Sequence, residues 1–303
     1  TVTDDGGSSG RLRDEFNILP PGDLRNCLVA LSHNEPLMAR LFQARYRNGE
    51  NLSGHSVGNL ILAALAQEEQ GNFLAAIALA GEVRNIQGRV VPATLVPARL
   101  VARLADGRRI IGESAIAAEN GRVAELALDP AAPPATPGVV EAIERADIVV
   151  LGPGSLYSSI VPILLLPQVR DALARTSAFR LLVLNAMTEP GETRGCSAGD
   201  HVRAVLAHAG ASVIDAVLAA TDTVPPDTLA RYHAEGAARV APDDAELDAL
   251  VPLVVRREML QVAPKVRHEP LATARAVLGA FDLWTARDRR PAGLGRGTGG
   301  ART

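Results

Sequence analysis

Apolar residues along this chain form two kinds of pattern: short continuous runs and longer stretches with helical spacing. Nearly continuous runs, each with one charged residue, cover residues 146–151, 180–184 and 213–219. Runs of this length, apolar on both faces, are typical of buried parallel strands. Helical spacing occurs before and after these runs, and a final helix is predicted over residues 271–284. The pattern predicts an α/β fold with a mostly parallel sheet.

Residues 89–130 show a different pattern, with short apolar or alternating runs. The dipeptides Asp106-Gly107 and Asn120-Gly121 separate these runs, and dipeptides of this kind favour hairpin turns. We therefore predict a small antiparallel β insertion that is attached to the main sheet. The insertion contains no residue pattern that indicates chemistry.

The chain opens with an acidic and glycine-rich segment. Residues 1–3 include β-branched side chains, two aspartates follow, and glycines and serines fill positions 6–10. In an α/β protein this order is typical of a strand that ends in a glycine-rich loop at a ligand-binding edge, where backbone N–H groups can approach an anion closely. The aspartates would hold ribose hydroxyls, a ring N–H or a metal ion, and an ordinary turn is the alternative. The candidate ligand-binding residues here are Asp4, Asp5, Gly6, Gly7, Ser8 and Ser9.

A second group of polar residues lies on a helix that is predicted to start with Ser53 as its N-cap. His55 and Asn59 lie one turn apart on one face, near the helix end that attracts anions. A structural histidine is the alternative. Asp23 is predicted to cap an earlier helix, and Arg25 either faces the opening loop or is a solvated side chain.

Polar loops also follow the predicted strands 146–151 and 180–184. The first loop combines glycines with hydroxyl groups, and its backbone N–H groups could bind phosphate. The second loop begins with an amide side chain that is placed to contact a base or a sugar. Further along, Arg267 is either a bidentate phosphate clamp or a surface side chain. The candidate residues in the two loops are Gly152, Gly154, Ser155, Tyr157, Asn185 and Thr188.

Composition narrows the class of protein. The 303 residues are 47% apolar and 3% aromatic, with a net charge of −3; no nucleic-acid partner is predicted, because such proteins usually carry a basic stripe. Two cysteines without metal-type spacing fit a reducing compartment. The longest apolar run, residues 160–167, is too short to cross a bilayer, which predicts a soluble cytoplasmic protein. Residues 1–286 are predicted to form one α/β domain, and the Arg/Gly-rich residues 287–303 a disordered tail.

Several motifs resemble those of a known family. They are, in order, TVTDDGGSSGRLR, PPGDLRNCL, NLSGHSVGNL, LGPGSLYSSIVP and NAMTEPGETRG, with Asp200-His201 shortly after. From Thr1 to about Trp284 the chain is similar to the gluconeogenesis-factor (YvcK-like) proteins within the 2-phospho-L-lactate transferase (CofD-like) superfamily. The resemblance implies a Rossmann-like three-layer sandwich and a cytoplasmic bacterial protein. Because family members usually begin with a strand and a GGGTG loop, we expect such a first strand and glycine-rich loop to belong before Thr1.

The resemblance also implies a role in cell shape, or morphogenesis, and in cell-wall homeostasis during gluconeogenic growth. Members of the family bind UDP-activated sugars such as UDP-N-acetylglucosamine (UDP-GlcNAc). A tyrosine and an arginine associated with that site correspond to Tyr232 and Arg267. Arg194 and Cys196 depart from the family pattern, which usually has an acidic and an aromatic residue at these positions.

The leading hypothesis is a binding and regulatory protein, without a catalytic residue, whose polar loops surround a nucleotide-sugar diphosphate. The alternative is a Mg²⁺-dependent transferase that moves a phospholactyl-type group from a nucleotide diphosphate donor, with the metal held by Asp4 or Asp5. Such a transfer depends on positioning and charge neutralisation. A third interpretation is a scaffold that contacts a kinase or a cell-wall enzyme through residues 89–130. A homodimer and a protein partner in cell-wall synthesis are further expectations.

Overall fold

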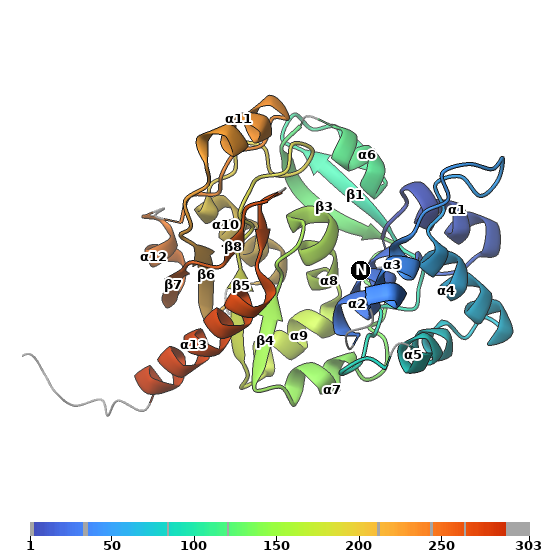
Figure 1. Cartoon of the computed structure of the whole chain (residues 1–303). Coiled ribbons are helices and arrows are strands. Elements are labelled where there is room, and N and C mark those ends of the chain that lie inside the picture. The colour runs from blue at the N-terminus through green and yellow to red at the C-terminus, as the bar shows by residue number, and fades with distance from the viewer. Residues whose placement is uncertain are drawn as a thin grey trace, which may run out of the picture.

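A parallel sheet forms the centre of the molecule (Figure 1). The computed structural model describes residues 3–32, 36–83, 85–119, 121–210, 213–242, 245–263 and 265–288. The sheet contains β4 (Ile148–Leu151), β5 (Phe179–Val183), β6 (Ala216–Ala220) and β7 (Leu253–Arg257), in that spatial order and all parallel. The parallel pairing confirms the predicted parallel strands. The interior strands β5 and β6 are covered on both faces, as expected for apolar runs, whereas Val150 of the edge strand β4 is exposed. The predicted strand at 213–219 begins three residues later than expected.

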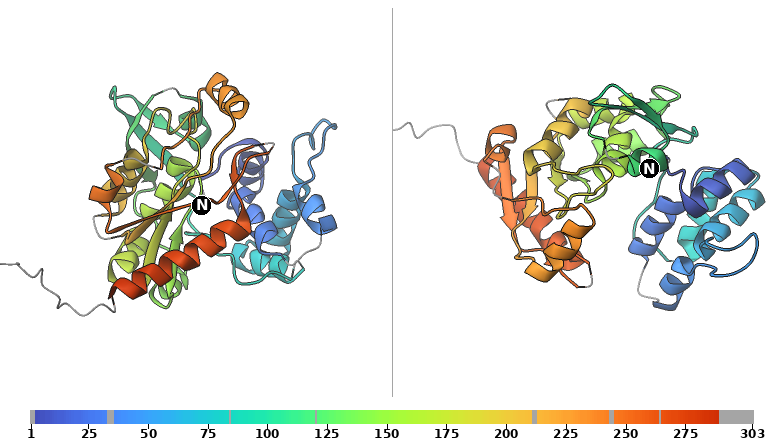
Figure 2. Two further views of the ribbon diagram at one scale, coloured as in Figure 1. Left: turned by 60° about the vertical axis from the view of Figure 1, so that its left-hand side comes forward. Right: turned by 90° about the horizontal axis from the view of Figure 1, so that it is seen from above.

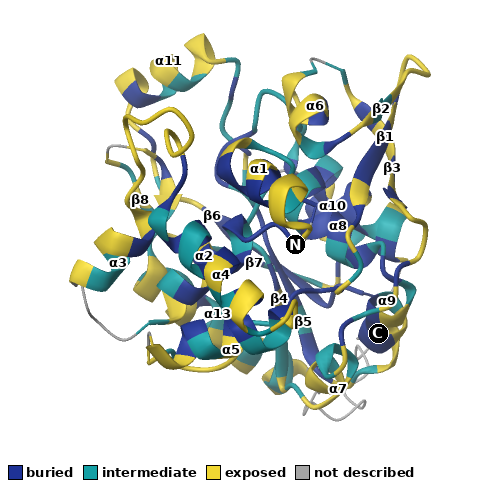
Figure 3. Cartoon of the chain, turned by 90° about the vertical axis from the view of Figure 1, so that its right-hand side faces the viewer, coloured by how far each residue is buried: buried dark blue, intermediate teal, exposed yellow. Residues whose placement is uncertain are grey.

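Helices cover both faces of this sheet, which makes the predicted three layers. On one face, Leu182 and Val217 pack against α8 (Val161–Leu164), α9 (Pro167–Arg175) and α10 (Ala198–Ala209). On the other face, Leu181 and Leu218 pack against α13 (Pro270–Asp288). Ala276 and Ala280 of α13 lie one turn apart and are buried, so the helix approaches the sheet closely. Figure 3 shows the interior strands β5 and β6 as mostly buried.

The predicted antiparallel insertion is also confirmed. It contains β1 (Arg99–Leu104), β2 (Arg109–Ile111) and β3 (Val123–Asp129) in the order β2-β1-β3. Its buried face shares one core with the α8–α10 side of the main sheet. The turn at Asp106-Gly107 joins β1 to β2, and Gly107 supplies the positive φ of +89° that this turn needs. A helix, α6 (Glu113–Ala118), lies between β2 and β3 and was not predicted; Asn120, the first residue of the second expected hairpin, lies outside the described residues.

The first third of the chain forms a group of helices with its own apolar core. In Figure 2 these helices lie together on one side of the molecule, and the C-terminal half of the chain lies on the other. The group consists of α1 (Gly7–Phe16), α2 (Gly22–Leu31), α3 (Pro36–Gln43), α4 (Val57–Glu68) and α5 (Phe73–Val83).

Both predicted helix caps in this group are wrong. The N-cap of α4 is Ser56, whose side chain accepts a hydrogen bond from the amide of Asn59, whereas Ser53 is exposed and lies before the helix. The N-cap of α2 is Pro21, and Asp23 is the second helical residue. There its carboxylate still complements the positive end of the helix dipole.

The remaining elements connect the strands. They are α7 (Val139–Glu144), the π-helical turn η1 (Leu156–Ile160), α11 (Pro226–Ala234), α12 (Leu247–Leu250), β8 (Leu260–Gln261) and β9 (Arg267–His268). The strand expected at 254–262 is therefore two strands, β7 and the hairpin strand β8. Helix α13 passes residue 286 and ends at Asp288, and residues 289–303 of the predicted tail lie outside the described residues. Among the described helices, none is both long and apolar enough to cross a membrane.

Candidate functional site

The carboxyl edge of the parallel sheet carries the loops in which most of the predicted site residues lie. Residues 152–159 follow β4, residues 184–193 follow β5, and residues 221–225 follow β6. The β8–β9 hairpin comes after β7 on the same edge. Because carboxyl ends of parallel strands share one edge, these segments form a common rim, which is where α/β sheets bind ligands.

The loop in the opening segment is shorter than the sequence predicted. Helix α1 already begins at Gly7, so Gly7, Ser8 and Ser9 are helical residues and not part of a long loop. Asp4 Oδ1 accepts the amide of Gly6 at 3.0 Å. The first-turn amides of Gly7, Ser8 and Ser9 have no hydrogen-bond partner among the described residues. They leave the positive end of α1 open to an anion.

A buried hydrogen-bond network fixes the start of α1 against α4. Ser8 Oγ lies 3.0 Å from His55 Nδ1 and accepts from Asn59 Nδ2 at 3.1 Å. Asn59 Nδ2 also lies 3.4 Å from Ser9 Oγ. Burial lowers the pKa of His55, so its ring stays neutral. His55 and Asn59 thus hold Ser8 and Ser9 in place, and His55 precedes the helix instead of projecting from its first turn.

Arg25 reaches the same network and is not a solvated side chain. It is 7% exposed, and its Nη1 donates to Ser56 Oγ at 2.6 Å. Its Nε is buried without a hydrogen-bond partner. Ser56 in turn donates its amide to Ser8 Oγ at 3.4 Å. Ser56 therefore links a buried positive charge to Ser8 at the start of α1, which favours an anion there.

Helix α6 connects the opening segment to the loop that follows β5. Thr3 Oγ1 donates to Glu113 Oε2 at 3.0 Å, and Asp5 Oδ1 accepts the amide of Ser114 at 2.8 Å. At the other end of α6, a Cβ added to Gly191 would lie 1.8 Å from the carbonyl oxygen of Ala117. The insertion therefore contacts both the opening segment and the loop after β5, which its sequence did not indicate.

Glu113 is the acidic group of α6 that faces this region. Burial raises the pKa of Glu113 to about 8, with smaller contributions from the charges of Asp4, Asp23 and Glu192. These three carboxylates come from the opening segment, from α2 and from the loop after β5. The opening segment and the loops after the strands therefore lie on one side of the molecule.

Two carboxylates from the loop after β5 bind the loop that follows β4. Glu192 accepts hydrogen bonds from the amide of Tyr157 at 2.9 Å, the amide of Ser158 at 3.2 Å and Ser158 Oγ at 2.6 Å. Ser155 Oγ donates to Glu189 at 3.0 Å. The backbone amides of this loop, which the sequence analysis predicted to bind phosphate, thus already bind the side chain of Glu192. Gly152 has a φ of +78°, which lets the chain turn sharply after β4.

The ring of Tyr157 packs in the interior, where it meets His208 edge to face with 6.4 Å between the ring centroids. Burial raises the pKa of Tyr157 to about 12. A cleft of about 450 Å³ lies on the other side of the loop, between α2 and β4. Its lining includes Asp23, Asn26, Cys27, Gly152 and Gly154.

The loop after β5 and the β8–β9 hairpin form the far part of the rim. Thr188 is buried, and its Oγ1 accepts the amide of Ala238 at 2.8 Å, while Asn185 is half-buried. The hydroxyl of Tyr232 accepts the amide of Val266 at 3.0 Å. Val266 precedes Arg267, which is exposed on β9. Tyr232 therefore holds the segment that carries Arg267.

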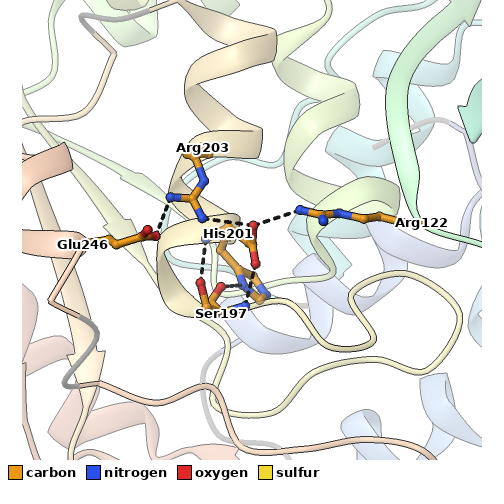
Figure 4. Close-up of polar contacts among 6 residues, drawn as sticks. Arg122, Ser197, His201, Arg203 and Glu246 are labelled. Carbon is orange, nitrogen blue, oxygen red and sulfur yellow. Dashed lines mark hydrogen bonds and ion pairs between the residues drawn. The ribbon is translucent and has the colours of Figure 1, made fainter. Parts of the chain in front are cut away.

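Asp200 and His201 have structural partners (Figure 4). Asp200 forms a capping box with Ser197 at the start of α10 and pairs with Arg122 at 3.0 Å and Arg203 at 3.1 Å. His201 Nδ1 donates to the carbonyl oxygen of Ser197 at 2.7 Å. Burial lowers the pKa of His201, so the ring is neutral.

Several carboxylates lie at or near the opening segment, yet the described ones do not form a metal-binding group. Within the described residues, no three His, Cys, Asp or Glu side chains are arranged to hold a metal ion. Asp5 is already bonded to Ser114. Asp4 likewise accepts the amide of Gly6, so each of the two predicted metal ligands has one carboxylate oxygen in a hydrogen bond.

Comparisons with known proteins place the chain in a family. Residues 1–260 match the family of 2-phospho-L-lactate transferase CofD. A gluconeogenesis factor of Bacillus subtilis is 42% identical over 89% of this chain and 85% of that protein. A relative from Nostoc is 44% identical over 92% of this chain, which spans 61% of that longer protein. A crystal structure of a upf0052 family protein from Bacillus halodurans has a TM-score of 0.87 and 39% identity, covering 91% of this chain and 88% of the other. This chain therefore belongs to the 2-phospho-L-lactate transferase CofD family, and its curated relatives include gluconeogenesis factors.

Proposed function

We propose that this chain is a regulatory protein that binds a nucleotide sugar of the UDP-sugar type at the rim described above. The observation that carries the proposal is the open start of α1. Three unbonded amides lie there beside the buried guanidinium of Arg25, and this arrangement favours a diphosphate. The loops after β4 and β5 lie on the same side and would contact the sugar and the nucleoside.

The acidic groups next to α1 favour a ligand that arrives with a divalent cation. The carboxylates of Asp4 and Glu192 would repel a bare diphosphate, whereas Glu113, whose pKa is raised to about 8, carries little charge at neutral pH. Mg²⁺ usually takes most of its ligands from phosphates and water and only one or two from carboxylates. We therefore propose that Asp4 contacts a Mg²⁺ ion held mainly by the diphosphate. This arrangement needs no complete metal site in the protein itself.

Tyr232 and Arg267 fit this proposal as a pair. Arg267 is exposed on β9 and has no ion pair among the described residues. Its guanidinium is free to bind a phosphate bidentately. Tyr232 acts through the amide of Val266, next to Arg267, so its role is to position the arginine. The family relationship adds the proposal that ligand binding serves cell shape and cell-wall homeostasis during gluconeogenic growth.

Isothermal titration calorimetry with UDP-N-acetylglucosamine and Mg²⁺ tests the proposal. We expect saturable binding by the wild type, at least about tenfold weaker binding by Arg267→Ala and weaker binding by Tyr232→Phe. Arg103→Ala is the matched control, because Arg103 is exposed and pairs with Glu125 on the insertion. Absence of saturable heat with the wild type would overturn the proposal.

A transferase is the second candidate, and one observation favours it. Glu113, with a pKa raised to about 8, is close to neutrality, where a general acid or base works best. It lies beside Asp4, and the matching family is named for a transferase. The reaction would move a phospholactyl-type group from a nucleotide diphosphate donor onto an acceptor hydroxyl, whose oxygen forms the new P–O bond as the nucleoside monophosphate leaves, and Mg²⁺ would neutralise the phosphates. Release of nucleoside monophosphate that requires Mg²⁺ and is lost in Glu113→Gln would support it, and unchanged donor in protein that binds ligand would exclude it.

A further inference from the structure

Helix α13 has an outer face that carries large apolar side chains and that no other part of the described chain covers. In the left view of Figure 2, α13 lies at the front of the molecule, with no other element in front of it. Leu271 and Leu278 lie about two turns apart on this face and are 57% and 58% exposed. Single exposed leucines are common on protein surfaces, but three further features distinguish this face.

The first feature is a pair of opposite charges between and beside the leucines. At spacings of four, three and four residues, one stripe on the helix, the outer stripe, is formed by Leu271, Arg275, Leu278 and Asp282. Both charged side chains are exposed, and neither makes an ion pair or a side-chain hydrogen bond among the described residues. They lie about 10 Å apart along the helix axis, so they do not pair with each other.

The second feature is a glycine in the middle of the helix, next to Leu278. A Cβ added to Gly279 would have no heavy atom within 4 Å, and the φ of Gly279 is not positive. The fold of a single chain therefore has no steric need for glycine at this position. Glycine inside a helix is nevertheless less stable than alanine. The close approach of another molecule to the helix accounts for it.

The third feature is that the outer stripe is complementary to itself when two copies lie antiparallel. In a two-fold symmetric contact, each pair of facing residues occurs twice. If the axis passes beside the Leu278–Gly279 peptide, Arg275 faces Asp282 of the second copy, and Leu278 lies over Gly279 of the second copy. One alignment thus pairs all four charges and places each central leucine on a residue without a side chain. A parallel contact would place Arg275 beside Arg275, where the charges repel.

We propose that α13 is the interface of a two-fold symmetric homodimer, in which the outer stripes of two copies pack antiparallel. At each end of the contact Leu271 lies against Ala286, which is exposed in the single chain. Two helices of 19 residues bury less area than a standard stable interface, so the dimer forms at micromolar concentrations and dissociates on dilution. The inference is independent of the proposed function, because α13 covers a face of the sheet and the rim lies at its carboxyl edge.

Sedimentation velocity over a series of protein concentrations tests the proposal. The wild type should convert reversibly from monomer to dimer as its concentration rises, whereas Leu278→Arg should stay monomeric throughout the series. Leu37→Arg is the matched control, because Leu37 of α3 is a leucine with 70% exposure outside the outer stripe; it should dimerise like the wild type. Thermal unfolding verifies that each variant is folded. A wild type that stays monomeric, or a Leu278→Arg variant that dimerises equally well, would overturn the inference.

Exchanged charges identify the antiparallel alignment. Arg275→Asp and Asp282→Arg each place like charges at both ionic contacts, so each variant should self-associate at least about tenfold less well than the wild type. A mixture of equal amounts of the two variants brings opposite charges together at both contacts and should dimerise like the wild type. A dimer through another face, or a face that binds a different protein, does not give this rescue. If the mixture associates no better than the separate variants, the inference is wrong.

Replacement of Gly279 separates dimerisation from the stability of the helix. Gly279→Leu should raise the melting temperature of the dilute monomer, because leucine is a better helix former and its side chain meets open space. The same variant should dimerise less well, since the new side chain occupies the place of Leu278 of the second copy. Gly279→Leu that dimerises as well as the wild type would contradict the close approach at this residue and, with it, the proposed interface.

Discussion

The carboxylate of Asp5 accepts a hydrogen bond from the backbone amide of Ser114 at 2.8 Å, although 109 positions separate the two residues. A Cβ added to Gly112 would lie 2.5 Å from Asp5 Oδ2, so only glycine leaves room for this contact. Asp5 therefore satisfies the start of α6 from outside, where α6 has no capping side chain of its own. An opening residue that the sequence marks as a ligand contact thus fixes the insertion to the rim.

Replacement of Asp5 by alanine is expected to loosen α6. Loss of a side-chain cap costs about 1 kcal/mol of unfolding free energy, measurable by urea denaturation. Hydrogen exchange at the Ser114 amide should accelerate in Asp5→Ala and stay slower in Asp5→Asn, which keeps an acceptor. An unchanged exchange rate at Ser114 in Asp5→Ala would show that Asp5 does not hold the helix.

Replacement of Glu192 by alanine tests whether its carboxylate occupies an anion-binding position in the loop after β4. The amides of Tyr157 and Ser158 would lose their acceptor, at a cost of about 1–3 kcal/mol. Added phosphate or acetate should then raise the melting temperature of the variant more than that of the wild type, because the anion takes the vacated place. Glu189→Ala, which loses a single bond from the Ser155 hydroxyl, is the control. Equal anion responses in both variants would contradict the prediction.

Much of the fold could be predicted because its strands carry a strong local signal. Residues 148–151 and 181–184 are apolar without alternation, a pattern typical of parallel strands. Strand β5 is indeed covered on both faces, whereas Val150 of the edge strand β4 is 42% exposed. The order of the loops along the chain then places their polar residues at one edge. The rim could therefore be anticipated from the sequence, since it depends on parallel topology alone.

The unpredicted parts of the site depend on contacts between distant residues. Helix α6 buries one residue, Ile116, and its start is satisfied by Asp5, so its own sequence shows neither an apolar face nor a cap. Ser53 and Ser56 are equal as local capping residues, and tertiary bonds from Arg25 to Ser56 Oγ and from the Ser56 amide to Ser8 Oγ separate them. No sequence pattern reveals that Glu192 would fill the loop after β4.

The buried ion pair between Arg180 and Asp215 is expected to matter more than exposed pairs. Arg180 Nη2 donates to Asp215 Oδ1 at 2.6 Å and Nε to Oδ2 at 2.8 Å, with the side chains 15% and 11% exposed. Asp215→Ala removes the carboxylate from a largely buried guanidinium, and breaking a buried ion pair in this way costs about 3–5 kcal/mol. The exposed pair of Arg103 with Glu125, at 56% and 61% exposure, should contribute less than about 1 kcal/mol. Urea denaturation of Asp215→Ala and Glu125→Ala compares them, and similar losses would refute this ranking.

The pH dependence of the unfolding free energy should reveal the raised pKa of Glu113. Its pKa rises from 4.5 to about 8 on folding, with burial as the main cause, so the folded protein holds a proton that the unfolded chain releases. The stabilisation from the extra proton on Glu113 is complete below the pKa of 4.5 in the unfolded chain. It is lost as pH rises through the pKa of about 8 in the folded protein. Unfolding free energy should therefore fall as pH rises from about 4.5 to about 8, on the order of 1–3 kcal/mol after solvent screening.

The variant Glu113→Gln distinguishes the contribution of Glu113 to this pH dependence from that of the other titratable groups. The glutamine keeps an acceptor for Thr3 Oγ1 but cannot ionise, so the decrease in stability with rising pH should flatten. Glu125→Gln, at an exposed carboxylate on β3, should retain the wild-type slope. Urea midpoints measured for the three proteins at several pH values supply the comparison. If Glu113→Gln shows the same slope as the wild type, then Glu113 is already ionised at neutral pH, and neither its protonated state nor a general-acid role beside Asp4 can be maintained.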